Sequence, residues 1–64
     1  MPIIHIQVLE GRSKETIKSL IAGVTDTVAK ELDSPKDRIR VLVSEIPGSH
    51  WGIAGVSAED IGNR

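Results

Sequence analysis

The sequence contains no cysteine, and its two histidines, His5 and His50, lie near opposite ends of the chain. Disulfides are therefore excluded, and the histidines lack any spacing typical of a structural zinc site. At 64 residues the chain forms a small domain, which buries only about 60% of the surface that the unfolded form exposes. Such domains usually need disulfides, a metal or partner subunits for stability. With the first two excluded or disfavoured, the composition predicts oligomerisation.

Aromatic residues and charge of one sign are also scarce. Trp51 is the only residue of the Phe, Tyr and Trp types. The chain has eight basic and nine acidic residues, which give a formal net charge of −1. Nucleic-acid binders need stacking platforms or a positive field, and anionic membranes attract basic surfaces. We therefore expect neither nucleic acid nor membrane as a partner. No apolar run approaches the roughly 20 residues of a membrane span, and the N-terminus lacks the features of a signal peptide, so we expect a cytoplasmic protein.

Apolar periodicity predicts a strand, a helix and a second strand. β-branched residues between Pro2 and Leu9 favour the first strand. Ser13 is suited to cap a helix with Glu15 in its first turn, and Asp33, Ser34 and Pro35 end it. The helix carries an apolar stripe at i, i+3, i+4 and i+7 spacing, made of Ile17, Leu20, Ile21, Val24, Val28 and Leu32.

A second strand is predicted over Ile39–Ile46, closed by Pro47. Strand, helix and strand make a βαβ unit of the α/β class, with parallel strands and a right-handed connection. The glycine-punctuated tail, with Gly48, Gly52 and Gly55, predicts a short hairpin or extended arm. We expect residues 1–64 to form one domain.

Alternation along the strands divides their side chains between two faces. One face is aliphatic and should lie under the helix: Ile4, Ile6, Val8, Ile39, Val41 and Val43. The other mixes apolar and polar residues: Ile3, Leu9, Leu42, His5, Gln7, Arg40 and Ser44. This mixture favours contact with other subunits, since a two-stranded sheet is rarely stable alone. A solvated face with scattered apolar residues is the alternative.

Pro2 is the residue with the most distinctive chemistry, because removal of Met1 would expose a secondary amine. A model α-amino group has a pKa of about 7.7 to 8.0, and neighbouring cations lower the pKa of such an amine. A general base works best when its pKa lies near the working pH. Many unrelated proteins also begin with Met-Pro, so this feature alone does not establish the function.

Arg12 and Arg40 are candidate carboxylate ligands, because a guanidinium binds carboxylates through two parallel hydrogen bonds. Salt bridges to Glu10 or Glu45 are the alternative. Trp51 is either an apolar wall for a substrate or a packed interface anchor. The two histidines have no catalytic partner in a motif and are interpreted as structural or surface residues.

Pro2 and Arg12 flank the first strand, so roughly 20 Å or more separates them at about 3.3 Å per residue. No arginine side chain spans that distance. If both act on one small molecule, they belong to different subunits, and the pocket lies at an interface.

Four segments in one order resemble the 4-oxalocrotonate tautomerase family along nearly the whole chain. They are Met1-Pro2-Ile3, Leu9-Glu10-Gly11-Arg12-Ser13, Ile39-Arg40-Val41, and His50-Trp51-Gly52-Ile53 followed by Gly55. The tail from Val56 to Arg64 departs from the family pattern, in which a further C-terminal arginine helps to bind substrate. Trp51 occupies a position where phenylalanine is common, and the larger ring leaves less room.

The resemblance implies a keto-enol tautomerase that converts 2-hydroxydienoates, such as 2-hydroxymuconate, into 2-oxo isomers. Pro2 would be the general base, Arg12 would bind the distal carboxylate, and Arg40 would interact with the 2-oxo and carboxylate end. Trp51 and Leu9 would line the pocket. The substrate would be a small dicarboxylate or 2-oxo acid, no cofactor or metal would be required, and the chain would form a homohexamer, a trimer of dimers, that serves aromatic degradation.

Two alternatives stay open. A hydratase-dehalogenase or decarboxylase of the same superfamily would need a water-activating carboxylate, for which Glu10 and Glu45 are the candidates. A non-catalytic oligomer that binds small carboxylates would be favoured if Met1 is retained, because Met1 blocks the amine.

Overall fold

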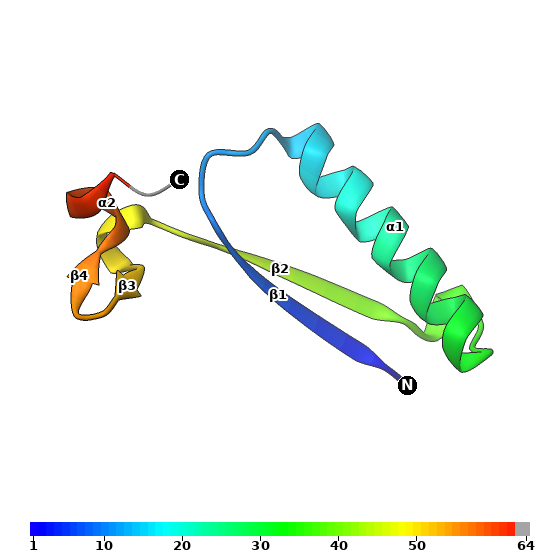
Figure 1. Ribbon diagram of the computed structural model, residues 1–64. Helices are drawn as coiled ribbons and strands as arrows, with labels where there is room; N and C mark the ends of the chain where they lie inside the picture. The colour runs from blue at the N-terminus through cyan, green and yellow to red at the C-terminus, as the bar shows by residue number, and fades with distance from the viewer. Residues whose placement is uncertain (63–64) are drawn as a thin grey trace.

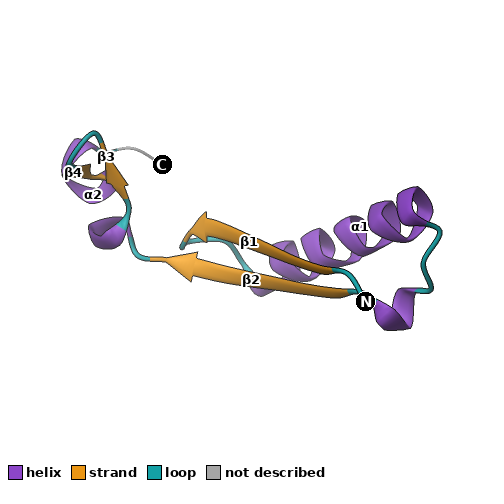
Figure 2. Cartoon of the chain, turned by 90° about the horizontal axis from the view of Figure 1, so that it is seen from below, coloured by secondary structure: helices purple, strands orange, loops and turns teal. Residues whose placement is uncertain are grey.

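The computed structural model describes residues 1–62, so Arg64 lies outside the described residues. Two strands and the helix between them form a layered unit, and a run of short elements forms an arm beyond it (Figures 1 and 2). The strands are β1 (Ile3–Leu9) and β2 (Arg40–Ile46), and the helix is α1 (Lys14–Leu32). The predicted α/β class is confirmed, although each strand begins one residue later than predicted.

β1 and β2 pair in parallel along their whole length, from Ile3 opposite Arg40 to Leu9 opposite Ile46. The six aliphatic residues predicted to face the helix are all half-buried or buried, and Ile39 is only 7% exposed. The opposite face is open, because Ile3 is 67% and Leu42 51% exposed. The predicted division of the sheet into two faces is confirmed at these positions.

The ends of α1 follow from local chemistry. The Ser13 hydroxyl accepts a hydrogen bond from the backbone N–H of Thr16 at 3.1 Å, which satisfies one free donor of the first turn. Asp33 ends the helix in the left-handed conformation, with φ 50°, and its N–H donates to the carbonyl of Ala29. Asp tolerates this conformation better than most residues, so the predicted start and end of the helix are both confirmed.

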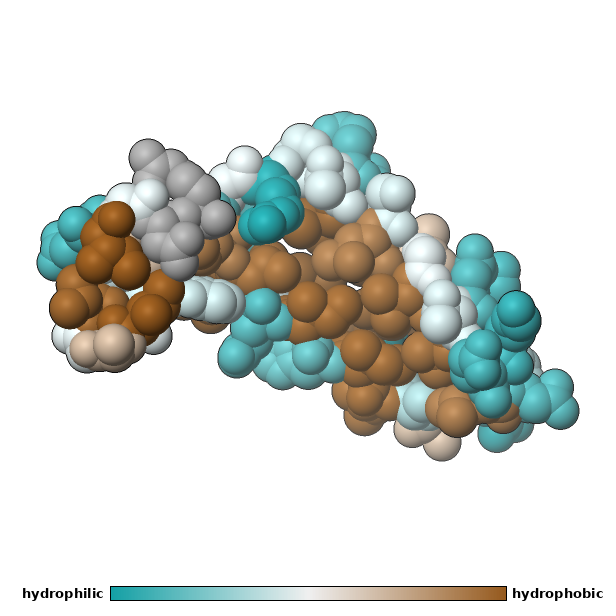
Figure 3. Space-filling model, in the orientation of Figure 1, coloured by the Kyte–Doolittle hydropathy of each residue, from teal (hydrophilic) through white to brown (hydrophobic). Residues whose placement is uncertain are grey.

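The single chain buries little apolar surface. Among the described residues only Ile39 and Ala58 are buried, and no residue of α1 is. The radius of gyration is 14.5 Å, whereas a compact chain of this length has about 11 Å. Figure 3 shows the result as an apolar band that runs across the middle of the molecule at the surface. A chain of this shape needs further surface to cover that band, which fits the predicted oligomerisation.

The arm begins after β2 and points away from α1 (Figures 1 and 2). It comprises the 3₁₀ turn η2 (Gly48–His50), the strands β3 (Gly52–Ile53) and β4 (Val56–Ser57), and the helix α2 (Ala58–Ile61). β3 and β4 pair antiparallel, so the predicted hairpin is confirmed. The short helix α2 was not predicted, although the Ser57 hydroxyl caps it by accepting from the N–H of Asp60 at 3.2 Å.

The hairpin turn offers a test of the local geometry. Ala54 and Gly55, its two central residues, have φ of 53° and 87°, and two positive φ values are typical of a type I′ turn that prefers Asn-Gly. Alanine is sterically strained in this conformation. We expect Ala54→Asn to raise the free energy of unfolding by about 0.5–1 kcal/mol, measured by denaturant unfolding at fixed protein concentration.

Ala22→Asn is the matched control for this substitution, because Ala22 is also exposed but lies in the middle of α1. Asparagine is a weaker helix former than alanine, so the control should destabilise the protein. Equal destabilisation by both substitutions would contradict the turn assignment.

Candidate active site

Pro2 lies at the end of the sheet where β2 begins. The backbone N–H of Arg40 donates to the carbonyl oxygen of Pro2 at 3.1 Å, and Arg40 pairs with the next residue, Ile3. Pro2 is half-buried, whereas Met1 is 76% exposed. The backbone of Pro2 is therefore held through its carbonyl group, while the residue before it lies open to solvent.

Arg12 lies beyond the opposite end of β1. Its Nη1 donates to the carbonyl oxygen of Leu9 at 2.8 Å, so the guanidinium folds back over the end of the strand. The seven residues of β1 stand between Arg12 and Pro2, a separation of roughly 20 Å or more. One chain therefore does not bring Pro2 and Arg12 together.

Leu9 and Trp51 lie toward the same end as Arg12. Leu9 pairs with Ile46, the last residue of β2, and the chain continues from there into the arm. Trp51 is half-buried, and its carbonyl oxygen accepts from the N–H of Ala58 at 2.7 Å, which ties it to α2. The five predicted site residues thus form two groups at opposite ends of the sheet, with Pro2 and Arg40 in one group (Figure 1).

Both arginines are exposed and bind backbone carbonyl groups rather than carboxylates. The Nη1 of Arg40 donates to the carbonyl oxygens of Asp37 at 2.8 Å and Ile39 at 3.3 Å. Within the described residues neither arginine forms an ion pair. The alternative, a salt bridge to Glu10 or Glu45, is therefore absent from that part of the chain. A guanidinium carries five N–H donors, and each arginine retains donors for an anionic ligand.

Arg38 is a further basic residue near this site that the sequence prediction did not include. It ends the 3₁₀ turn η1 (Lys36–Arg38), which directly precedes β2. Lys36 pairs with Asp26 at 2.6 Å, but the Arg38 side chain has no hydrogen bond or ion pair in the described part of the chain. The signal in the sequence was the alternation of basic residues at positions 36, 38 and 40.

The histidines bind neighbouring hydroxyl groups. The Nε2 of His5 lies 2.7 Å from the Oγ of Ser44 across the strands, and the Nδ1 of His50 lies 2.9 Å from the Oγ of Ser49. These contacts fit the interpretation of both histidines as structural residues. Across residues 1–62 there is no group of three or more His, Cys, Asp or Glu side chains that could hold a metal. None of the helices in that range is long and apolar enough to cross a membrane.

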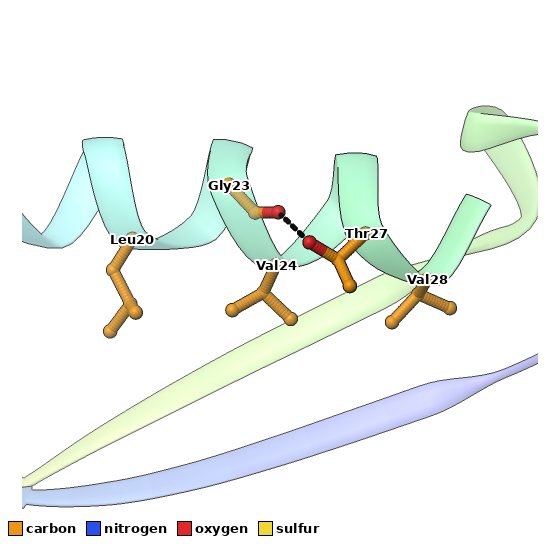
Figure 4. A pocket seen from close by; sticks show the side chains of 5 residues that line it. All are labelled: Leu20, Gly23, Val24, Thr27 and Val28. Atoms are coloured by element: carbon orange, nitrogen blue, oxygen red, sulfur yellow. Dashed lines mark hydrogen bonds between the residues drawn. The ribbon is translucent and has the colours of Figure 1, made fainter. Parts of the chain in front are cut away.

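An apolar hollow lies along α1 and is lined by Leu20, Gly23, Val24, Thr27 and Val28. Leu20, Val24 and Val28 point to the side of the helix on which the strands lie, and the Thr27 hydroxyl donates to the Gly23 carbonyl at 3.1 Å (Figure 4). No titratable side chain lines the hollow, and none of the predicted site residues does. It is part of the apolar stripe of α1 and offers nothing for proton transfer.

Comparison with known proteins identifies the family. A family model described as tautomerase enzyme matches residues 2–61. The chain belongs to the tautomerase family. It is 45% identical over 62 residues to 2-hydroxymuconate tautomerase of Stutzerimonas stutzeri. The aligned region covers 97% of this chain and 98% of that protein. The structure of TomN, a 4-oxalocrotonate tautomerase homologue of tomaymycin biosynthesis, matches with a TM-score of 0.93 at 30% identity, over 98% and 97% of the two chains.

Membership of the tautomerase family confirms the predicted class of enzyme, an isomerase that interconverts keto and enol forms. A 4-oxalocrotonate tautomerase of Chloroflexus aurantiacus, described as a heterohexamer, matches with a TM-score of 0.90 at 31% identity, over 95% and 98% of the two chains. Oligomers are thus found among the solved tautomerases of this fold. Other relatives are named only as probable tautomerases, so the substrate of this tautomerase stays a prediction, as do the roles of its site residues.

Proposed function

We propose that this tautomerase converts 2-hydroxydienoates, with 2-hydroxymuconate as the representative substrate, into their 2-oxo isomers. The observation that carries the proposal is the pair of exposed guanidinium groups, Arg12 and Arg40, which have no carboxylate partner within the described chain. A dienoate with a carboxylate at each end offers one anionic group to each arginine. The identity of 45% to a 2-hydroxymuconate tautomerase supports the same substrate class.

The proposed reaction moves one proton. The nitrogen of Pro2, exposed by removal of Met1, takes the proton of the 2-hydroxyl group, and the electron pair left on oxygen forms the 2-oxo group as the double bonds shift. The prolinium then returns the proton to a carbon further along the conjugated system. Arg40 stabilises the negative charge that develops on the 2-oxygen, and Arg12 holds the distal carboxylate. The shift changes no oxidation state, so we assign it no cofactor or metal.

Trp51 and Leu9 are proposed to form the apolar wall of the pocket. Both are half-buried, and apolar walls exclude water, which strengthens the attraction between a guanidinium and a developing oxyanion. The indole of Trp51 also limits the width of the substrate. An extended, unbranched dienoate fits this restriction better than a bulky enol.

The proposed active site is shared between subunits, because Pro2 and Arg12 lie at opposite ends of β1. The open face of the sheet, with Ile3 and Leu42 exposed, and the projecting arm supply the surfaces for assembly. We propose a homohexamer built as a trimer of dimers, formed from a single-domain chain. We further propose a cytoplasmic enzyme that acts in the degradation of aromatic compounds.

One experiment tests the reaction and the assembly together. We expect purified protein that begins with Pro2, as checked by intact mass, to sediment as an oligomer at micromolar concentration. The same sample should ketonise 2-hydroxymuconate, followed by the loss of enol absorbance. A monomer would contradict the assembly, and assembled, processed protein without turnover would contradict the reaction.

A further inference from the structure

The guanidinium of Arg40 is held by the chain segment that precedes β2. Its Nη1 donates to the carbonyl oxygen of Asp37 at 2.8 Å and to that of Ile39 at 3.3 Å. A guanidinium carries five N–H groups, and only those on Nη1 are used in these contacts. The Nε and Nη2 groups, which form one planar fork, stay available for an anionic ligand. The position of the Asp37 carbonyl therefore influences the direction of this fork.

The carbonyl of Asp37 belongs to the 3₁₀ turn η1. The N–H of Arg38 donates to the carbonyl of Pro35 at 3.1 Å, and the N–H of Ile39 donates to a second carbonyl of the turn. That second acceptor is Lys36, also at 3.1 Å. These bonds do not use the Asp37 carbonyl, so it is available to the guanidinium. Because its neighbours are tied together, a displacement of the turn would displace this carbonyl as well.

One ion pair joins the turn to α1. The Nζ of Lys36 lies 2.6 Å from the Oδ1 of Asp26, and the two side chains are 67% and 63% exposed. An exposed pair of this kind contributes little to the stability of a fold. Asp26 lies inside a regular helix of 19 residues, whereas Lys36 begins a turn of three. The pair therefore restrains the turn more than it restrains the helix.

We infer that Lys36 and Asp26 are positioning residues for Arg40. Their ion pair holds η1 against α1, the turn fixes the carbonyl of Asp37, and that carbonyl orients the guanidinium toward the 2-oxygen of the substrate. The inference rests on the proposed function, in which Arg40 stabilises the charge that develops on this oxygen. Lys36 and Asp26 act through Arg40, so loss of their pair lowers the fraction of sites in which the guanidinium is correctly oriented.

Removal of the lysine charge tests the ion pair directly. We expect Lys36→Met to lower the kcat for 2-hydroxymuconate by about three- to fivefold, the upper part of the range for an exposed ion pair. The loss falls on kcat, because Arg40 acts on charge that develops in the transition state. Asp26→Asn breaks the same pair from the helix and should have the same effect. Lys36→Arg keeps a cation opposite Asp26 and should restore the kcat of the unmodified enzyme.

Lys18→Met is the matched control for Lys36→Met. Lys18 is also exposed, lies on α1 and forms no ion pair within the described residues. Its replacement changes the net charge of the chain by the same amount. We expect kcat to stay within about twofold, as for most surface substitutions.

A second background separates positioning from a role in stability. In an Arg40→Gln variant the guanidinium that the ion pair orients is absent, so Lys36→Met should cause no further loss of kcat. An effect on stability or assembly alone would lower kcat by the same factor in both backgrounds. The Arg40→Gln samples are assayed at higher enzyme concentration to follow their slower turnover, and sedimentation checks the assembly of every variant.

The outcomes distinguish this inference from the proposed function. If the unmodified enzyme does not ketonise 2-hydroxymuconate, or if Arg40→Gln loses no activity, the proposed function fails. If the enzyme is active and depends on Arg40, but Lys36→Met keeps the original kcat or lowers it equally in both backgrounds, the inference is overturned. Should Lys36→Met fail to assemble, Asp26→Asn replaces it in both backgrounds. A loss of kcat that requires Arg40 then supports the inference, and any other result overturns it.

Discussion

A residue or tag that precedes Pro2 should abolish the ketonisation of 2-hydroxymuconate. An N-terminal extension converts the secondary amine into an amide nitrogen, whose lone pair is delocalised and cannot take a proton. Loss of a general base typically lowers the rate by a factor of about 10² to 10⁴. Pro2→Ala should retain some activity, because a primary amine remains at the same position. The expected order of kcat is processed enzyme, then Pro2→Ala, then the extended form.

The structure indicates that these variants keep their fold. Pro2 is held by the bond from the N–H of Arg40 to its carbonyl oxygen, and alanine provides the same carbonyl group. Met1 is exposed in the single chain, so residues added N-terminal to Pro2 do not disrupt the packing within that chain. The matched control is one tagged protein assayed before and after cleavage of the tag directly before Pro2, with sedimentation of both samples. If the assembled, tagged form turns over substrate as fast as the cleaved form, Pro2 is not the base.

Two impaired variants should regain activity when their subunits are mixed. In a Pro2→Ala variant the amine is altered and Arg12 is intact, and in Arg12→Ala the reverse holds. Because Pro2 and Arg12 lie at opposite ends of β1, a shared site takes them from different chains. Random mixing in equal amounts then gives about one site in four with both native groups, because every interface in a symmetric homo-oligomer is equivalent.

The mixing experiment dissociates the two variants together in denaturant and removes the denaturant by dilution. Native mass spectrometry of the reassembled protein verifies that mixed oligomers form. The control samples are each variant carried alone through the same steps, which should show no gain in activity. Mixed oligomers without any gain in kcat would show that Pro2 and Arg12 do not meet in one site across subunits.

Several elements were predictable because their causes lie close together in the sequence. The start of α1 depends on a bond between Ser13 and Thr16, and its end depends on the ability of Asp33 to adopt a positive φ. The division of the strands into two faces follows from the two-residue repeat of an extended chain. Short elements were predictable only in part, since the single turns η1, η2 and α2 are too brief to establish an apolar periodicity.

By itself the sequence determined the strand-helix-strand order, the two faces of the sheet and the identities of the residues predicted to carry the chemistry. Each depends on the type of a residue or on a repeat of a few positions. Only the tertiary structure decided which of these residues lie together. Parallel pairing of β1 and β2 sets Pro2 beside Arg40 across nearly 40 positions of sequence, and the arm carries Trp51 away from both. The buried Ile39 likewise leaves Arg38 and Arg40 exposed together. Residue spacing along a chain does not determine distances across a sheet, because those distances depend on strand register and on which apolar surfaces pack together.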